Sequence, residues 1–144
     1  MKHTDPSVIL KKSFPKPVTE VWEALTDPGR MRAWFFPQIA EFEPESGFET
    51  RFEVESGGRT FPHVWKVTDV KSPEWIRYDW HYEGYPGKAY VDFRLKEVTG
   101  STILVLTFST VEDFPGNIPE FTRESCKAGW DFLIGERLSD YLAG

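Results

Sequence analysis

Ile76–Glu83 reads Ile-Arg-Tyr-Asp-Trp-His-Tyr-Glu, so large apolar residues alternate strictly with charged or polar ones. Because successive side chains of a β-strand point to opposite faces, this pattern predicts a strand with one buried face and one wet face. Ala89–Lys96 repeats the alternation after the turn Gly84–Gly87, and Phe48–Glu55 shows it earlier in the chain. Period two with one charged face is typical of an antiparallel sheet that exposes one side to water.

Three further segments have strand-like composition. They are Ser7–Phe14, Arg59–Val70 and Thr102–Ser109, which brings the predicted strands to six. Two helical patterns lie between the predicted strands Ser7–Phe14 and Phe48–Glu55. Val18, Val21, Trp22 and Leu25 follow helical spacing after Pro17, and Asp27-Pro28 is a typical helix start that precedes Met31, Trp34 and Phe35.

A long helix is predicted from about Pro119 to Leu142. At 100° per residue, one side of this helix carries an apolar stripe, formed by Cys126, Trp130, Leu133, Ile134, Leu138 and Tyr141. Only this helix is long enough to cover the apolar face of a six-stranded sheet. The expected fold class is therefore α+β, with one sheet and one long C-terminal helix.

The length and composition of the chain exclude several classes of function. At 144 residues, we expect a single domain, 1–144. A net charge of −6 with no basic block argues against a nucleic-acid partner. The lone cysteine, Cys126, excludes an internal disulfide. No signal peptide and no apolar run long enough for a membrane span are evident, so a cytoplasmic location is expected.

Three groups of residues resemble the START-like (helix-grip, SRPBCC or Bet v 1-like) superfamily, in the branch named after the Hsp90-ATPase activator. The groups are Pro17-Val18 with Val21-Trp22, Ala24–Pro28 and Trp34-Phe35; Val67–Val70 with Pro73-Glu74 and Ile76–Trp80; and Gly129-Trp130 with Leu138 and Tyr141-Leu142. Two positions depart from the pattern. Ser46-Gly47 stands where this branch often has paired glycines, and Arg137 interrupts the apolar spacing of the last helix.

The resemblance implies that the curved sheet wraps around the last helix, that a cavity lies between them, and that the two short helices close one end. The alternation indicates which side chains face this cavity. The expected ligand-binding residues are Trp34, Phe52, Trp65, Tyr78, Trp80, Phe93, Phe108, Trp130, Ile134 and Arg137. Aromatic residues make up 16% of the chain, and they suit either a thick core or an aromatic-lined site.

Polar residues give little sign of catalysis. His81 has outward parity, His3 is in a terminal segment, and His63 faces inward but is expected to be a satisfied structural residue. No metal site and no cofactor are expected. Asp79 and Asp92 have outward parity, which indicates a solvated face. Arg137 either reaches the sheet edge or pairs with a glutamate such as Glu20 or Glu23, or else it anchors a ligand carboxylate.

Three functions are compatible with these observations. The first is binding of a hydrophobic or aromatic small molecule between sheet and helix. The second, implied by the resemblance, is a partner module that acts on a chaperone such as Hsp90. The third is a cyclase or aromatase-like enzyme, which ranks last because the predicted inward faces are almost entirely aromatic and aliphatic.

Overall fold

The computed structural model describes residues 1–144 and has six strands, with helices at two places in the chain. The strands are β1 (Val8–Phe14), β2 (Glu49–Ser56), β3 (Arg59–Lys71), β4 (Trp75–Tyr82), β5 (Lys88–Val98) and β6 (Ser101–Glu112). The helices are α1 (Val18–Thr26), α2 (Pro28–Trp34), the 3-10 turn η1 (Pro119–Phe121), α3 (Arg123–Phe132), the π-helical segment η2 (Leu133–Leu138) and α4 (Ser139–Ala143).

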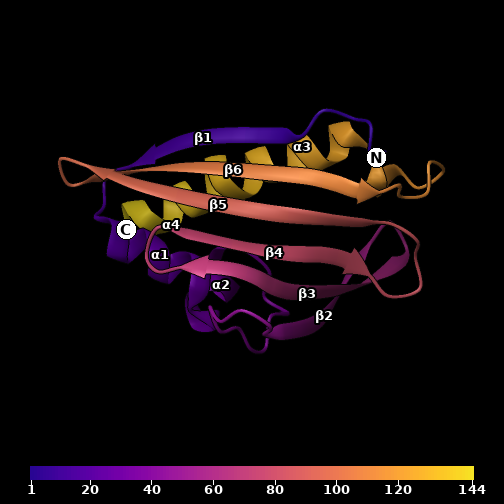
Figure 1. Cartoon of the computed structure of the whole chain (residues 1–144), viewed down its shortest axis with the longest axis horizontal. Coiled ribbons are helices and arrows are strands. Elements are labelled where there is room, and N and C mark those ends of the chain that lie inside the picture. The colour runs from indigo at the N-terminus through magenta and orange to yellow at the C-terminus, as the bar shows by residue number, and fades with distance from the viewer.

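The six strands form one curved antiparallel sheet in the order β1-β6-β5-β4-β3-β2 (Figure 1). The chain enters at one edge, crosses to the opposite edge through α1 and α2, and returns strand by strand to pair β6 with β1. The edge strand β2 carries Glu49, Arg51, Glu53 and Glu55 on one face. Such charges discourage pairing with another sheet.

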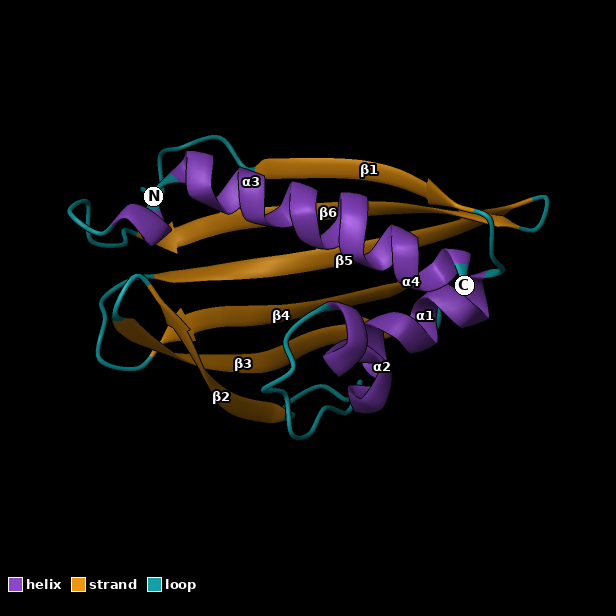
Figure 2. Cartoon of the chain, turned by 180° about the vertical axis from the view of Figure 1, so that it is seen from behind, coloured by secondary structure: helices purple, strands orange, loops and turns teal.

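The predicted alternation is confirmed on β4. Ile76, Tyr78 and Trp80 are buried, whereas Arg77 and Asp79 on the opposite face are only partly covered. The long C-terminal helix and the two short helices all lie on the concave side of the sheet, as Figure 2 shows from behind. The core therefore fills the layer between this face and the helices, and it includes Trp65, Phe93 and Leu106.

The two short helices are locked by specific hydrogen bonds. Asp27 caps α2 by accepting from the backbone N–H of Arg30 at 3.0 Å, as the Asp-Pro pair predicted. The indole Nε1 of Trp34 donates to the carbonyl of Ala24 at 2.7 Å and ties α2 to α1. Glu97 of β5 accepts from the first backbone N–H of α1, at Val18, which joins this helix to the sheet.

The C-terminal helix begins at Arg123 rather than at Pro119. Pro119–Phe121 form a separate 3-10 turn, and Thr122 caps α3 by accepting from the N–H of Ser125. The buried residues Trp130, Ile134, Leu138 and Leu142 recur every four residues. An α-helix has about 3.6 residues per turn, so a strict spacing of four drifts around it. The wider turns of η2 offset this drift, and they explain the irregular stripe around Arg137.

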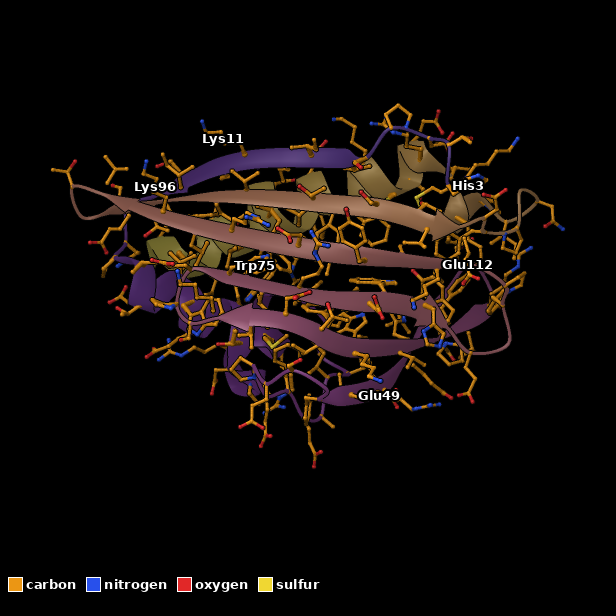
Figure 3. All side chains as sticks on the ribbon, viewed as in Figure 1. His3, Lys11, Glu49, Trp75, Lys96 and Glu112 are labelled. Atoms are coloured by element: carbon orange, nitrogen blue, oxygen red, sulfur yellow. The ribbon has the colours of Figure 1, made fainter.

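The convex face corrects one expectation from the sequence. Asp92 is only 3% exposed, although its outward parity indicated a solvated residue. Its carboxylate accepts from the indole of Trp75 at 2.7 Å and from the Nε atoms of Arg77 and Arg94 at 3.0 and 3.1 Å. Trp75 lies on this face, which is turned to the viewer in Figure 3. The side chains of Trp75, Arg77 and Arg94 therefore shield the Asp92 carboxylate from water.

Candidate functional site

A cleft opens between the C-terminal helix and the ends of β3 and β4. It has an inner chamber of about 140 Å³ and an outer chamber of about 410 Å³. Seven residues line both chambers, which makes the two continuous: Phe36, His63, Tyr82, Glu120, Ser125, Gly129 and Leu133. The outer volume lies within the range of roughly 300–1,000 Å³ typical of small-molecule sites. A closed apolar cavity of roughly 150 Å³, similar to the inner chamber, holds a benzene ring in other proteins.

Small residues on the helix leave this space open. Ser125, Gly129 and Leu133 follow one another at intervals of four along the helix, so they share a face, and all three line both chambers. A β-carbon added at Gly129 would meet no atom within 4 Å. Larger side chains at Ser125 and Gly129 would instead pack against the sheet and close the cleft.

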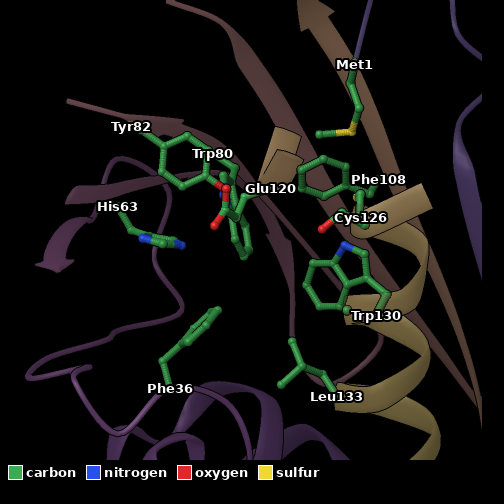
Figure 4. A pocket seen from close by; sticks show the side chains of 12 residues that line it. Met1, Phe36, His63, Trp80, Tyr82, Phe108, Glu120, Cys126, Trp130 and Leu133 are labelled. Carbon is green, nitrogen blue, oxygen red and sulfur yellow. The ribbon is translucent and has the colours of Figure 1, made fainter. Parts of the chain in front are cut away.

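Aromatic rings form the inner wall. Trp130 from α3 lies 5.6 Å from Trp80 and 5.9 Å from Phe108, measured between ring centroids. Trp80 and Phe108 meet edge to face at 5.5 Å. Phe36, from the loop after α2, faces Trp130 and Leu133 across the open space in Figure 4. This wall offers apolar contact to a flat ring.

His63 is a neutral polar group in this wall. It is 5% exposed and stacks on Phe52 at 4.9 Å. Its Nδ1 lies 2.8 Å from the carbonyl oxygen of Phe61, which can only accept, so Nδ1 carries the hydrogen. Burial lowers the pKa of His63 from 6.5 to about 4, an effect that the hydrogen bond to Phe61 opposes. The imidazole is therefore neutral at pH 7, and Nε2 is an acceptor with no partner in the chain.

Tyr82 supplies a donor beside His63. Its hydroxyl oxygen accepts from Nε1 of Trp80 at 2.8 Å, and the rings of Tyr82 and His63 meet edge to face at 4.7 Å. Burial raises the pKa of Tyr82 above its ordinary value, so the hydroxyl keeps its proton. Burial also raises the pKa of the Cys126 thiol to about 12, which makes this thiol a weak nucleophile.

Glu120 places a carboxylate at the rim. Its Oε2 accepts from the hydroxyl of Ser56 at 3.0 Å, and its Oε1 lies 3.9 Å from the guanidinium of Arg59. Oε1 is buried and has no hydrogen-bond partner. The turn between β2 and β3 supports the carboxylate closely, because a β-carbon at Gly57 would lie only 2.8 Å from Oε2.

The structure divides the ten residues expected to bind a ligand. Trp80, Phe108 and Trp130 line the inner chamber, and Arg137 lines the outer one. The other six are buried away from both chambers: Trp34, Phe52, Trp65, Tyr78, Phe93 and Ile134. Both Nε1 of Trp65 and the hydroxyl of Tyr78 are buried without a hydrogen-bond partner.

Arg137 caps a helix rather than pairing with a glutamate. Its Nε donates to the carbonyl of Trp34 at 2.8 Å, and its Nη2 donates to that of Ala33 at 3.1 Å. These are carbonyls at the end of α2, which an α-helix leaves without internal partners. Glu23, one of the expected partners, instead pairs with Arg30.

Several lining residues were not expected. Phe36, Tyr82, Glu120, Ser125 and Gly129 line both chambers, and His63, expected to be structural, has a free nitrogen there. The inward parity of Tyr82 was visible in the sequence. The small residues one helical turn apart beside the apolar stripe were a further signal, whereas the contribution of Glu120 depends on the 3-10 turn.

No three histidine, cysteine, aspartate or glutamate residues lie together in a way that could hold a metal ion. No helix combines the length and the apolar character required to span a bilayer.

A curved six-stranded antiparallel sheet over a long C-terminal helix, with two short helices after the first strand, defines the helix-grip fold of the START-like superfamily. Within it, the profile of the family described as Activator of Hsp90 ATPase homolog 1-like protein matches residues 15–143. The chain belongs to this family. No curated protein matches the chain significantly.

Solved structures share the fold. DynU16, described as a putative protein in the dynemicin biosynthetic locus, has 30% identity and a TM-score of 0.75 over 96% of this chain. The match covers 48% of DynU16, so this chain spans about half of its length. CV1439 from Chromobacterium violaceum has 20% identity and a TM-score of 0.79, over 96% of this chain and 97% of its own. CalU16 from Micromonospora echinospora has 24% identity and a TM-score of 0.70, over 95% and 76%.

Proposed function

We propose that this protein binds an apolar or aromatic small molecule in the cleft between its sheet and its C-terminal helix. The observation that carries the proposal is the inner chamber, which is bordered on one side by the mutually packed rings of Trp80, Phe108 and Trp130. Aromatic rings around a cavity with a few polar groups are typical of small-molecule sites. On this proposal Trp80, Phe108 and Trp130 contact the ligand, and the six buried residues support them.

The outer chamber would hold the rest of the molecule. Phe61, Phe121 and Phe132 line it, and Phe132 is 49% exposed. A ligand that covers Phe132 would remove apolar surface from water, worth about 25 cal/mol per Å² at best. Affinity should therefore rise with the apolar area of the ligand. We also propose, from the sequence, that the protein acts in the cytoplasm.

A reaction in the same cleft is a weaker second candidate. It has one observation in its favour, the presence of three titratable residues in the lining, His63, Tyr82 and Glu120. A general base works best with a pKa near the operating pH. The pKa of His63, about 4, is far below neutrality, so this imidazole is better suited to accept a hydrogen bond than to remove a proton.

A chaperone partner rests on the family's description alone. The large apolar side chains that are well exposed are Ile9, Val98, Val111 and Phe132, and they belong to four different elements. Apolar residues scattered in this way are normal on a protein surface. No observation of the surface favours this candidate over ligand binding.

The test fills the cleft from the helix. Gly129→Leu adds a side chain where a β-carbon meets no atom, between Ser125 and Leu133. Gly135→Leu is the matched control, because Gly135 is also unobstructed but lines neither chamber. Both changes replace a helical glycine, so neither should cost helix propensity.

The probe is the neutral apolar dye N-phenyl-1-naphthylamine, whose fluorescence rises in apolar sites. The original protein and Gly135→Leu should bind it, and Gly129→Leu should bind it at least about tenfold more weakly, because filling the cleft removes apolar contact area. Equal binding by all three proteins, or no binding by any of them, would contradict the proposed function.

A further inference from the structure

We propose that the molecule bound in the cleft carries an aromatic hydroxyl group, which meets His63 and Tyr82. This inference rests on the proposed function and adds the chemical class of the ligand. The free Nε2 of His63 would accept the hydroxyl hydrogen of the ligand, and the hydroxyl of Tyr82 would donate to the ligand oxygen. The aromatic ring would lie against Trp80 and Trp130 in the inner chamber.

The acceptor is fixed in place and in protonation. The carbonyl of Phe61 holds the Nδ1–H of His63, and the ring is clamped between Phe52, at 4.9 Å, and Tyr82, at 4.7 Å. In Figure 4 the imidazole points into the open space that Phe36 and Trp130 border. No group of the chain donates to Nε2, which faces the cleft, so a ligand that supplies a hydrogen there forms a hydrogen bond that the protein itself leaves to water.

The donor has a fixed direction for a similar reason. A phenolic hydroxyl has one hydrogen and can also accept, and the oxygen of Tyr82 already accepts from Trp80. Its own hydrogen has no acceptor in the chain and lies at the cavity that both chambers share. The site therefore offers one acceptor and one donor on neighbouring strands, because His63 of β3 is paired in register with Tyr82 of β4.

A hydroxyl group matches both requirements, since it donates one hydrogen and accepts another. A carboxylate could accept from Tyr82, but it has no hydrogen for His63 and would face the carboxylate of Glu120. An ammonium group could donate to His63 and Glu120, but it cannot accept the hydrogen of Tyr82. An ether accepts only. The polar groups of the cleft thus select a neutral hydroxyl among these four.

The experiment compares three probes with one aromatic body: 2-naphthol, 2-methoxynaphthalene and 2-naphthoate. Each is titrated against the bound dye N-phenyl-1-naphthylamine, and its dissociation constant is taken from the displacement. In the original protein, 2-naphthol should bind about tenfold more tightly than 2-methoxynaphthalene, as expected for the one hydrogen bond to His63 that the ether cannot make, and 2-naphthoate should bind most weakly.

Two variants test the two proposed residues. His63→Phe should lower the affinity for 2-naphthol by about 3- to 10-fold and leave 2-methoxynaphthalene within about twofold, because only the hydroxyl donates to His63. Tyr82→Phe should weaken both probes by a similar factor, because both oxygens can accept its hydrogen. Retained binding of 2-methoxynaphthalene by His63→Phe also shows that this variant is folded. His81→Phe is the matched control, because His81 lies on the other face of β4 and lines neither chamber.

The outcomes separate the two proposals. If 2-naphthol and 2-methoxynaphthalene bind equally, or if His63→Phe weakens both to the same extent, the hydroxyl preference is wrong while ligand binding stands. Tight binding of 2-naphthoate would likewise overturn it. If the dye and all three probes fail to bind, the proposed function itself is wrong.

Discussion

Replacing Asp92 with alanine removes an acceptor that three donors share on the convex face of the sheet. The carboxylate is 3% exposed and accepts from Trp75, Arg77 and Arg94 at 2.7–3.1 Å. Arg77 also lies over the ring of Tyr90 at 4.3 Å, and Arg94 lies over Trp75 at 4.7 Å. Asp92→Ala would therefore disconnect a cluster that spans β4 and β5.

The expected loss follows from which partners can return to water. A hydrogen bond to a charged group is worth about 1.5–3 kcal/mol, and breaking a fully buried ion pair costs about 3–5 kcal/mol. The side chains of Arg77 and Arg94 are 33% and 58% exposed, so their guanidinium groups can be hydrated again after the change. We therefore expect Asp92→Ala to lower the free energy of unfolding by about 2–4 kcal/mol, below the sum of three bonds.

Asp79→Ala is the matched control on the same face. Asp79 is partly exposed and has a single ion pair, with Lys88 at 3.3 Å. Exposed pairs of this kind contribute about 0–1 kcal/mol. Urea unfolding followed by far-UV circular dichroism gives both values without relying on the nearby tryptophan. Similar losses for the two variants, or a loss below about 1 kcal/mol for Asp92→Ala, would refute the burial argument.

Three other predictions concern the concave side and a turn. Trp130→Ala should lower the free energy of unfolding by about 3–5 kcal/mol in urea, and a loss near zero would place this ring outside the core. Because the pKa of His63 falls from 6.5 to about 4 on folding, the unfolded chain binds the proton more readily in this window. Stability should therefore fall by about 3 kcal/mol as pH drops from 6.5 to about 4, and His63→Phe should remove this part of the pH dependence measured by urea unfolding. Gly87→Ala should destabilise the protein by about 1–3 kcal/mol more than Gly84→Ala, measured as the difference in urea unfolding free energy. Both glycines have positive φ, but of the two only Gly87 would bring a β-carbon against a side chain, the ring of Phe114, so equal losses would contradict the clash.

The strands could be predicted because apolar and polar residues alternate within each segment. Alternation in Ile76–Glu83 depends only on the residues of that segment, and the observed burial on β4 follows it. The burial of Asp92 could not be predicted in the same way. It depends on the register between two strands, which places Arg77 opposite Asp92, and on Arg94 reaching back along β5. Parity tells which face a residue is on, but the neighbours on that face decide whether water reaches it.

The C-terminal helix shows the same limit. The sequence shows its apolar stripe at the spacing of an ideal α-helix, whereas the observed spacing of four from Trp130 to Leu142 requires the wider turns of η2. Arg137 then leaves the stripe and reaches the carbonyls of α2. No local pattern announces such a contact, because Arg137 and Trp34 are about a hundred residues apart in the chain.

The cleft begins where the loop after α2 no longer covers the inner face of β4. Along the inner face of β4, Tyr78 lies under Phe42 of the loop after α2, and Phe42 is 5.6 Å from it. Two residues on, Trp80 has rings on one side and the inner chamber on the other, and Tyr82 lines both chambers.

On β4, the same alternation thus contains one packed residue, Tyr78, and two that line the cleft, Trp80 and Tyr82. Parity selects all three as inward, and only the length of the covering loop and the small side chains of Ser125 and Gly129 separate them. A ligand in the cleft should accordingly shift the NMR signals of Trp80 and Tyr82 while leaving those of Tyr78 in place. Equal shifts for all three would mean that the ligand enters under the loop, and that Trp65 and Tyr78, with their unpartnered polar atoms, belong to the site after all.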